Sequence, residues 1–406
     1  MRLQNFPTMT VLMLCLGVAA LAQGQESVIH SFGSSTDGPD PAATLVFASD
    51  GAAYGTTVTG GMYGYGTVFQ LRFSNGEWVE SILYSFAGSP DGKNPYGGVV
   101  LDKSGNLYGT TVAGGNGGAC SGDGCGTVYK LSKSGSQYTE KVLYNFTGGN
   151  DGFGPGGGVV FDKSGNLYGT TPDGGKDSEG VVYELKPAGG GRWVQKTIHT
   201  FTGGKDGAVG SLGSLLLDGS GNLFGVAELG GAHGAGTLFE ISPLESGKWH
   251  FNILHAFRGE PGSGFPYGGL VFDKFKNLYG TTYYGGKYGV GSVFQFSPIN
   301  GYHESFLYSF KAAYDNSPTS TLLLDSSGNL WGTASSGGDT KCQCGAIFEM
   351  SLRGGLWTEK AIYLFKGDPD GAYPYYGLAQ DSSGALYGLT AAGGTQNQGA
   401  LFKFVP

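Results

Sequence analysis

The chain has 406 residues, of which 79 are Gly, and charged residues make up 14%, well below the roughly 25% of a typical soluble domain. Its formal charge is −8, with 24 basic and 32 acidic residues and no cluster of Lys or Arg. Because nucleic acids and anionic membranes are bound by basic patches, we expect neither as a partner.

An export signal is predicted at the amino terminus, over residues 1–22. An apolar stretch follows Arg2 and ends in Ala20-Leu21-Ala22, a small-x-small cleavage site. The stretch is too short for a stable membrane span, and no second one follows it. We therefore expect a secreted protein, periplasmic or extracellular, that begins near Gln23 and does not insert into a membrane after signal removal.

One pattern then occurs seven times, which predicts a single repeat domain over residues 23–406. Each copy contains a strand rich in aromatic residues whose last residue is Phe. These Phe residues are spaced by 53 to 60 residues. A repeat of this length indicates units that bury their apolar faces against neighbouring copies. The closing residues are Phe32, Phe86, Phe146, Phe201, Phe257, Phe310 and Phe365.

Four short antiparallel strands, here named A to D, fit each copy. In the second copy, strand A covers residues 98–102, and a tight turn leads to strand B at 106–111. Strand C covers 126–131, and after a polar turn strand D covers 138–146. Strands of this number and length are typical of propeller blades.

Alternation of apolar residues supports the strand assignment. In the D strand of the first copy, a period of two places Trp78, Ile82, Tyr84 and Phe86 on one face. Helical periodicity is absent after the amino terminus. The sequence therefore predicts an all-β protein.

The two ends of the domain complete each other. The mature chain opens with a lone D-type strand, residues 27–32, and closes with A, B and C strands but no D strand. Pairing these fragments removes an exposed sheet edge. We therefore predict a seven-bladed β-propeller with four antiparallel strands per blade, whose ring is closed by the first strand pairing with the last three.

The repeated motifs resemble the bacterial GloVer (Gloeo/Verruco) tandem repeat. They are Phe-x-Gly-Gly-x-Asp-Gly, Asp-x-Ser-Gly-Asn-Leu-Tyr-Gly-Thr-Thr and Gly-Thr-Val-Phe, and they cover the whole mature chain. The resemblance implies an exported β-propeller-like protein. Members often end in a cell-surface sorting signal, which the sequence does not show before Pro406. The resemblance carries no established reaction and implies no catalytic residues.

The antiparallel order of the four strands in each blade predicts which face of the ring binds a ligand. The D–A and B–C connections emerge on one face of the ring, and they include the long loops 86–98 and 111–126. The A–B and C–D turns on the opposite face are short. Because binding residues concentrate on long loops, we expect the D–A/B–C face to be the binding surface.

Two interpretations fit the Asp residues of the loops. They could bind cations as a ring of carboxylates, or each could cap the backbone of its own turn. A calcium site needs six to eight converging oxygens, which one Asp per blade does not supply, so we expect turns and no metal or cofactor. The series are Asp37, Asp91, Asp151, Asp206, Asp315 and Asp370 after the Phe, with Gly262 in the remaining copy, and Asp102, Asp162, Asp218, Asp273, Asp325 and Asp381 between strands A and B.

Four cysteines occur in two local pairs within B–C loops, Cys120 with Cys125 and Cys342 with Cys344. The pairs belong to the second and sixth copies, which lie nearly opposite in a seven-fold ring, so cross-pairing is excluded. In an oxidising compartment we expect a disulfide between Cys120 and Cys125. A disulfide between Cys342 and Cys344 would close a small ring. The alternative to disulfides is two separate zinc sites with two cysteines each.

Histidine and acidic residues supply the candidates for catalysis. His30, His199 and His255 occupy a position that holds Tyr in the other copies, which indicates a packing role. The B–C loops of the third and fourth copies contain Asp177, Glu179, Glu228 and His233, which neighbouring blades would bring together. These four are the candidates for an acid–base pair, although solvated loop charges produce such groups by accident.

Loop tyrosines are the preferred candidates for ligand binding. A tyrosine ring offers contact area and its hydroxyl offers a hydrogen bond at low entropic cost. The residues before strand A could instead pack between blades. The candidates are Tyr63, Tyr65, Tyr283, Tyr284 and Tyr288 in B–C loops, and Tyr96, Tyr267, Tyr375 and Tyr376 before strand A.

Three hypotheses of function follow. The first is an exported, non-catalytic monomeric scaffold that binds an extracellular glycan or a surface protein through the D–A/B–C face. The second is a polysaccharide lyase or hydrolase that acts at the mouth of the central channel, and the third is a structural protein of the cell envelope. The absence of a Gly-x-Ser-x-Gly, phosphate-loop or His-Glu-x-x-His motif favours the first over the second.

Overall fold

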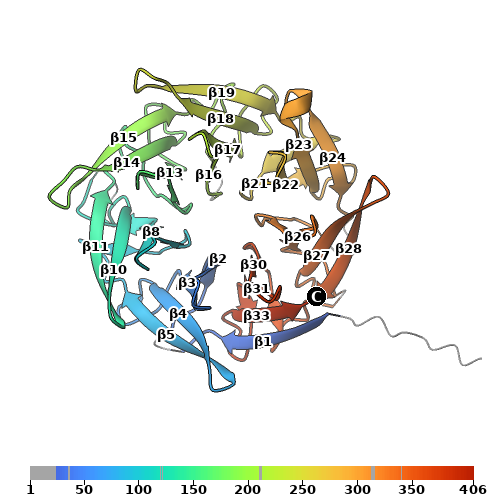
Figure 1. Ribbon diagram of the computed structural model, residues 1–406, viewed down its shortest axis with the longest axis horizontal. Coiled ribbons are helices and arrows are strands. Elements are labelled where there is room, and N and C mark those ends of the chain that lie inside the picture. Colours follow the sequence, from blue (N-terminus) through green and yellow to red (C-terminus); the bar gives the residue numbers. More distant parts are fainter. Residues whose placement is uncertain are drawn as a thin grey trace, which may run out of the picture.

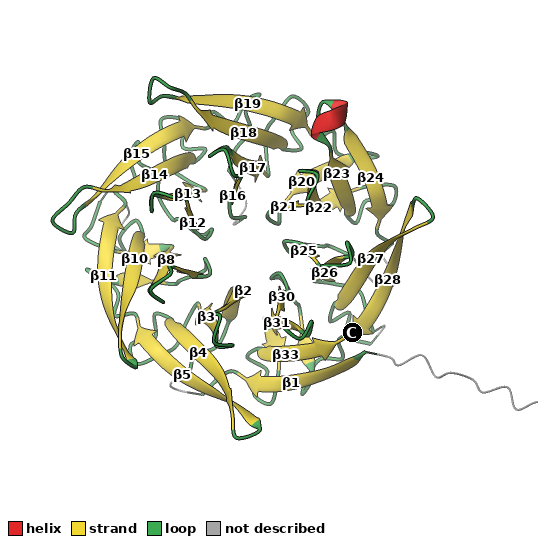
Figure 2. Cartoon of the chain, in the orientation of Figure 1, coloured by secondary structure: helices red, strands yellow, loops and turns green. Residues whose placement is uncertain are grey.

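Seven four-stranded antiparallel sheets surround a central axis in the computed structural model (Figure 1), which describes residues 24–34, 37–118, 120, 122–209, 213–311, 316–339 and 341–406. The predicted signal peptide lies outside these residues. Loops join the strands at both ends of every sheet (Figure 2), and one short 3-10 turn, Pro298–Asn300, interrupts the β-structure. The all-β, seven-bladed prediction is confirmed.

The blades follow one another in chain order. The first three are β2 to β5 (Pro41–Phe47, Ala53–Thr57, Thr67–Ser74, Glu77–Ser85), then β7, β8, β10 and β11 (Val100–Leu101, Leu107–Thr111, Thr127–Ser134, Gln137–Asn145), then β12 to β15 (Val160–Phe161, Leu167–Thr171, Val181–Pro187, Trp193–Thr200). The next two are β16 to β19 (Leu216–Leu217, Leu223–Ala227, Thr237–Pro243, Trp249–Ala256) and β21 to β24 (Val271–Phe272, Leu278–Gly285, Ser292–Phe296, Glu304–Ser309). The sixth is β25 to β28 (Leu323–Leu324, Leu330–Ala334, Ala346–Arg353, Leu356–Leu364).

The seventh blade joins the two ends of the domain. Its strands are β30 (Ala379–Gln380), β31 (Leu386–Thr390), β33 (Ala400–Val405) and β1 (Gln25–Ser31), in that order from the axis outward. In Figure 1 the blue strand β1 lies along the red strand β33, antiparallel to it. The predicted ring closure, one strand from the start with three from the end, is therefore confirmed.

The core lies between blades rather than within them, because each sheet buries both faces against its neighbours. The closing Phe residues are fully buried; Phe146 of the second blade, for example, packs against Tyr183 of the third at 5.1 Å between ring centroids. Burying each such ring contributes about 1.5–3 kcal/mol. These clusters fix the angle at which successive blades meet.

The prediction that Trp78, Ile82, Tyr84 and Phe86 share one face is wrong. A β-bulge shifts the register of β5 against β4 between Ile82 and Tyr84. Because one extra residue moves every later side chain to the other face, Trp78 and Ile82 pack toward the seventh blade, whereas Tyr84 and Phe86 pack toward the second. One D strand thus serves two interfaces.

The predicted C strand of the second blade is too short. It extends to Ser134, which pairs with Gln137, so the polar turn is reduced to Gly135 and Ser136. Lys133 pairs with Tyr138 in this hairpin, which projects beyond the buried part of the sheet. Polar composition was therefore a poor guide to the strand end, because an exposed hairpin continues its backbone ladder without an apolar core.

The long connections of the D–A/B–C face pair with each other. The D–A segment β6 (Gly92–Lys93) pairs with β9 (Ala113–Gly114) of the following B–C loop, and β29 (Gly371–Ala372) pairs likewise with β32 (Ala392–Gly393). In the fifth blade β20 (Ser263–Pro266) pairs directly with β22. This face therefore consists of loops that hydrogen bonds hold in place.

No helix in the described part of the chain has the length and apolarity needed to span a membrane.

Candidate functional site

A cavity of about 600 Å³ lies on the axis at the D–A/B–C face, where the chain enters the innermost strand of each blade. We call it the channel mouth. All seven blades contribute to its lining, and most do so through Gly, Thr or Ser at the two positions before strand A, such as Gly97 and Gly98. These small residues keep the axis open. The volume falls within the range of about 300–1,000 Å³ that is usual for small-ligand sites.

Tyrosines are the large side chains of this lining. Tyr96, Tyr267 and Tyr375 occupy one repeat position, directly after a proline, in the second, fifth and seventh blades. The same position holds Ala42, Gly156 and Thr319 in three other blades. Because they belong to three different blades, the three tyrosines enter the mouth from separate directions.

The rings converge across the axis. Burial raises the pKa of the Tyr376 hydroxyl, and the neighbouring hydroxyls of Tyr96 and Tyr267 raise it further. Tyr283 adds a ring from a B–C loop, 6.1 Å from Tyr267 between centroids. We call these four residues, together with Tyr375, the tyrosine cluster: Tyr96, Tyr267, Tyr283, Tyr375 and Tyr376.

The sixth blade holds the backbone of the cluster. The Thr333 hydroxyl donates a hydrogen bond to the carbonyl of Tyr376 at 3.0 Å, and the Thr319 hydroxyl donates to the carbonyl of Tyr375 at 3.0 Å. Both threonines belong to the neighbouring blade. The backbone of Tyr375 and Tyr376 is thus positioned before any ligand arrives, which reduces the ordering cost of binding.

Glu228 is the acidic residue beside the cluster. It follows strand β17 at the repeat position that Tyr283 occupies in the next blade, and its charge acts on the Tyr267 hydroxyl. Burial raises the pKa of the Glu228 carboxyl above its usual range. A half-buried carboxyl of this kind is suited to accept a hydrogen bond from a ligand hydroxyl, or to donate one when it is protonated.

The other acid–base candidates lie apart from Glu228. His233 and Asp177 are exposed on their loops, and Glu179 lies beside the backbone of Gly203. Among the described residues, no hydrogen bond or ion pair joins any of the three to Glu228. The structure therefore does not bring the four candidates together as one group.

The remaining tyrosine candidates lie outside the channel mouth. Tyr284 is next to Tyr283, with 4.4 Å between the ring centroids, and is half exposed. Tyr63 is exposed, and Lys93 lies 5.4 Å from the ring centroid of Tyr65. Tyr288 similarly has Lys287 and Lys311 against its ring, at 5.4 and 5.7 Å.

Sequence reasoning missed Tyr373 and Asp40. The Tyr373 ring stacks near that of Tyr375, at 6.4 Å between centroids, and Asp40 lines the channel mouth. Both have positive φ angles, 59° and 58°, immediately before the proline that enters strand A. A non-Gly residue in that conformation is rare, but the sequence alone does not reveal its φ angle.

The loop Asp residues act within their own turns. Asp91 accepts hydrogen bonds from the Tyr84 hydroxyl at 2.9 Å and from the amide of Ala87 at 2.8 Å. Asp102 accepts from the amides of Ser104 and Asn106, at 2.8 and 2.9 Å. The same arrangement recurs in most blades, which accounts for both Asp series; Asp315 lies outside the described residues.

The histidines of the D strands contact acidic residues. His199 lies 3.3 Å from Asp206, at the position where Tyr84, Tyr144 and Tyr363 donate to their Asp at 2.9–3.0 Å. His255, whose loop has Gly262 in place of Asp, lies 3.4 Å from Glu304. His30 contacts both Asp37 and Glu80.

Both local cysteine pairs are bonded. Disulfides join Cys120 to Cys125 and Cys342 to Cys344, with Cα separations of 5.3 and 5.1 Å. Each closes a B–C loop of its own blade and buries at least one cysteine, Cys125 or Cys344, against an interblade cluster. Each disulfide therefore restrains its own B–C loop.

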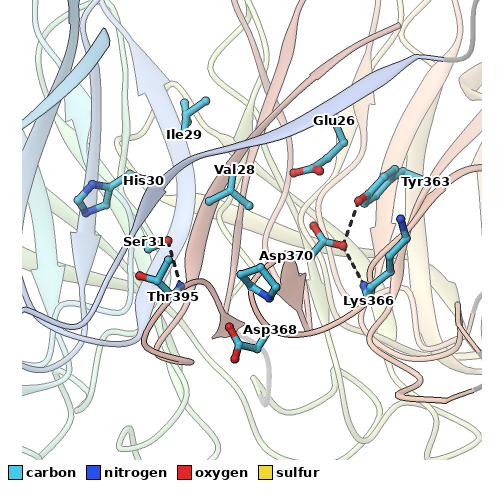
Figure 3. Close-up of a pocket in the computed structure, with 11 residues that line it drawn as sticks. Glu26, Val28, Ile29, His30, Ser31, Tyr363, Lys366, Asp368, Asp370 and Thr395 are labelled. Atoms are coloured by element: carbon cyan, nitrogen blue, oxygen red, sulfur yellow. Dashed lines mark hydrogen bonds between the residues drawn. The ribbon is translucent and has the colours of Figure 1, made fainter.

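A second hollow, of about 690 Å³, lies at the outer rim beneath β1 (Figure 3). Figure 3 shows Glu26 facing Asp370, which accepts hydrogen bonds from the Tyr363 hydroxyl at 3.0 Å and the Lys366 amide at 2.9 Å. Burial and the nearby Asp370 raise the pKa of Glu26 to about 7. Since this groove is open and is lined largely by one strand and one loop, it offers a ligand less enclosure than the channel mouth.

The fold and repeat define a class, the seven-bladed propeller built from tandem copies of one sequence unit. The sequence profile of the Gloeobacter/Verrucomicrobia repeat matches residues 19–213 and 211–406, so the chain belongs to this repeat family. No curated protein sequence matches the chain.

Solved structures of similar fold share little sequence with this chain. A candidate 6-phosphogluconolactonase from Bacteroides uniformis has a TM-score of 0.52 and 15% identity, covering 86% of this chain and 89% of its own. A candidate oxidoreductase (glucose dehydrogenase) from Thermus thermophilus has a TM-score of 0.47 and 13% identity, covering 94% of this chain and 100% of its own. A Dyadobacter fermentans protein of unknown function has a TM-score of 0.47 and 11% identity, with 95% and 99% covered. At such identities the likeness concerns the fold alone.

Proposed function

We propose that this protein is an extracytoplasmic scaffold that binds a glycan at the channel mouth. The observation that carries the proposal is that four tyrosines from three blades line one cavity of about 600 Å³, with Tyr283 against one of them. Aromatic faces pack on the apolar faces of sugar rings, and tyrosine hydroxyls exchange hydrogen bonds with sugar hydroxyls. Small Gly and Thr residues leave room between the rings.

Charge and compartment are consistent with this ligand. Asp40 and Glu228 are the acidic groups at or beside the mouth, and a carboxylate is able to accept hydrogen bonds from sugar hydroxyls. The net charge of −8 disfavours a polyanionic ligand, so a neutral or basic glycan is the expected class. Two disulfides support a location outside the cytoplasm.

Hydrolysis of the glycan is the second candidate function, because Glu228 is a carboxyl with a raised pKa beside the mouth. Glycoside hydrolysis ordinarily needs a second carboxyl across the scissile bond. His233, Asp177 and Glu179 do not line the mouth. Asp40 does, but it belongs to the first blade and Glu228 to the fourth, so binding without turnover is the better-supported function.

A glycan array with wild-type protein, followed by titration calorimetry on the strongest ligand, tests the proposal. We expect Tyr267→Ala and Tyr375→Ala each to weaken binding about tenfold or more, which corresponds to about 1.4 kcal/mol. Tyr63→Ala removes an exposed tyrosine of the same face that does not line the mouth, and we expect it to bind like wild type.

Product analysis of the same mixtures separates the two candidate functions. Recovery of intact glycan from the mixtures supports binding without hydrolysis. Product formation that is lost in Glu228→Gln would establish hydrolysis instead, and equal loss of affinity in Tyr63→Ala and Tyr267→Ala would move the site away from the mouth. Binding to a surface protein but to no glycan would also overturn the proposal.

A further inference from the structure

Three side chains with metal-binding atoms meet where the ring closes. His30 lies on β1 of the seventh blade, Asp37 lies in the loop that follows, and Glu80 lies on β5 of the first blade. The His30 Nε2 atom is 3.3 Å from Asp37 Oδ2 and 3.5 Å from Glu80 Oε2. In Figure 3 the His30 ring points away from Asp370, toward the blue strands of the first blade.

The other blade junctions act as internal controls for this cluster. At the junction of the third and fourth blades, His199 and Asp206 are present, but Phe251 stands at the Glu80 position and stacks on the imidazole at 3.7 Å. At the next junction His255 and Glu304 are present, but Gly262 replaces the Asp. The remaining four junctions have Tyr at the His position, at Tyr84, Tyr144, Tyr308 and Tyr363. The combination of His, Asp and Glu therefore occurs once in seven copies.

The cluster brings two largely buried carboxyls close together beside one imidazole. The Asp37 and Glu80 side chains are only 6% and 12% exposed, and within the described chain no Lys or Arg forms an ion pair with either. The buried Oε1 atom of Glu80 has no hydrogen-bond partner. Two carboxylates held together away from water are stabilised by a bound cation.

The second oxygen of Asp37 is already fixed. Its Oδ1 atom accepts hydrogen bonds from the Ser34 hydroxyl at 2.8 Å and the Gly33 amide at 3.3 Å, which leaves Oδ2 toward His30. Partners of this kind orient a metal ligand. Ligand atoms of a tetrahedral zinc ion, at bonds of about 2.0–2.1 Å, stand about 3.3–3.4 Å apart, close to the two separations around His30 Nε2.

We propose that His30, Asp37 and Glu80 bind one divalent cation of the zinc class, with water in the remaining coordination position. Imidazole together with carboxylate favours zinc over calcium or magnesium, which take oxygen ligands. Because His30 belongs to the closing strand and Glu80 to the first blade, the ion ties β1 to its neighbour. The site would stabilise the ring where a terminal strand completes it.

Metal analysis and thermal unfolding of the full chain test the site. Protein stripped with a chelator and titrated with zinc chloride is expected to bind one ion per chain, with a melting temperature that rises with zinc concentration. Variants His30→Tyr and Glu80→Gln introduce the residues found at the same positions of other blades, Tyr84 and Gln195, so the fold should persist. We expect each to weaken zinc affinity by about 100-fold or more.

His199→Tyr provides the matched control, because it makes the same substitution at a junction without the third ligand. It should bind zinc as wild type does. Failure of the wild type to bind stoichiometric zinc, or unchanged zinc affinity in both His30→Tyr and Glu80→Gln, would refute the site. Binding of calcium in preference to zinc would refute the assignment to the zinc class. Circular dichroism of each metal-free variant verifies that a lost affinity does not reflect unfolding.

Discussion

A glycine precedes every C strand, and its backbone conformation explains why no other residue stands there. At Gly126 φ is +92°, and an added Cβ would lie 2.4 Å from the carbonyl oxygen of Thr111 and 2.7 Å from Pro155 of the next blade. The Gly126 carbonyl also accepts the amide of Phe146, the residue that closes the D strand. One small residue thus serves the turn, the hairpin and the contact between blades.

We predict that Gly126→Ala destabilises the protein by about 3 kcal/mol or more, because it combines a left-handed backbone with a clash against backbone atoms. Gly135→Ala is the control, since Gly135 also has positive φ, +63°, but an added Cβ meets nothing within 4 Å. We expect it to cost about 1 kcal/mol. Denaturant unfolding measures both, and equal losses would show that the clash is unimportant.

Glu140 is a buried carboxyl at the junction of the first and second blades. Burial and the nearby Asp91 raise its pKa to about 7. The groups that face it are Asp91, Tyr84 and Tyr129, none of which supplies positive charge. The folded protein therefore holds a proton there that the unfolded chain, with a pKa near 4.5, releases earlier.

We predict that this carboxyl makes stability fall as pH rises. A folded pKa above the unfolded value gives a contribution that is fully present below pH about 4.5 and is lost as pH passes about 7. Glu140→Gln, which places the residue of Gln195 at the same repeat position, should reduce this decline in melting temperature between pH 5 and pH 8. The exposed Glu77→Gln serves as control, and an identical pH profile in Glu140→Gln and wild type would contradict the assignment.

At the scale of elements, the bulged D strand is the part of the blade that the sequence concealed. Period-two alternation is visible in residues 78–82, but the extra residue at Leu83 leaves no mark in composition, since an apolar side chain suits either face. The bulge recurs in every blade between the same two C-strand positions, Val68 and Phe69 in the first. Strand number, order and closure were predictable because they depend on counting motifs.

Strand β1 is the element on which closure depends. We predict that deletion of residues 24–31 leaves β33 with an open edge and produces aggregation or a large fall in melting temperature. A synthetic peptide of residues 24–34 should restore part of the lost stability by adding the strand back. Differential scanning calorimetry with and without the peptide measures this, and a deletion variant that melts like wild type would contradict the closure.

At the scale of the whole molecule, the ring converts sequence differences between copies into a single site. Pro-Tyr at residues 95–96, 266–267 and 374–375 identifies candidates, but the sequence does not show that rings 108 to 279 residues apart meet over one axis. Conversely, loop position alone made Tyr63 and Tyr288 appear equivalent to Tyr283, although only the last joins the cluster. The distance of a loop residue from the axis depends on how far its loop extends, which composition does not encode.

The Glu80 carboxylate was likewise absent from the sequence-based candidates, because its partners His30 and Asp37 had simpler roles in the repeat. Comparing corresponding positions across blades, once their contacts are known, distinguishes this junction from the others. Residues shared by most copies build the ring, whereas the copy-specific tyrosines, Glu228 and the junction cluster distinguish individual blades.

Glycan binding at the channel mouth is tested by a crystal structure of the protein with the glycan that binds most strongly on the array. We predict a sugar ring against Tyr267 or Tyr375 within the channel mouth, hydrogen-bonded to the tyrosine hydroxyls, Asp40 or Glu228. A glycan bound instead in the rim groove beneath β1, or on the face of short A–B and C–D turns, would contradict it.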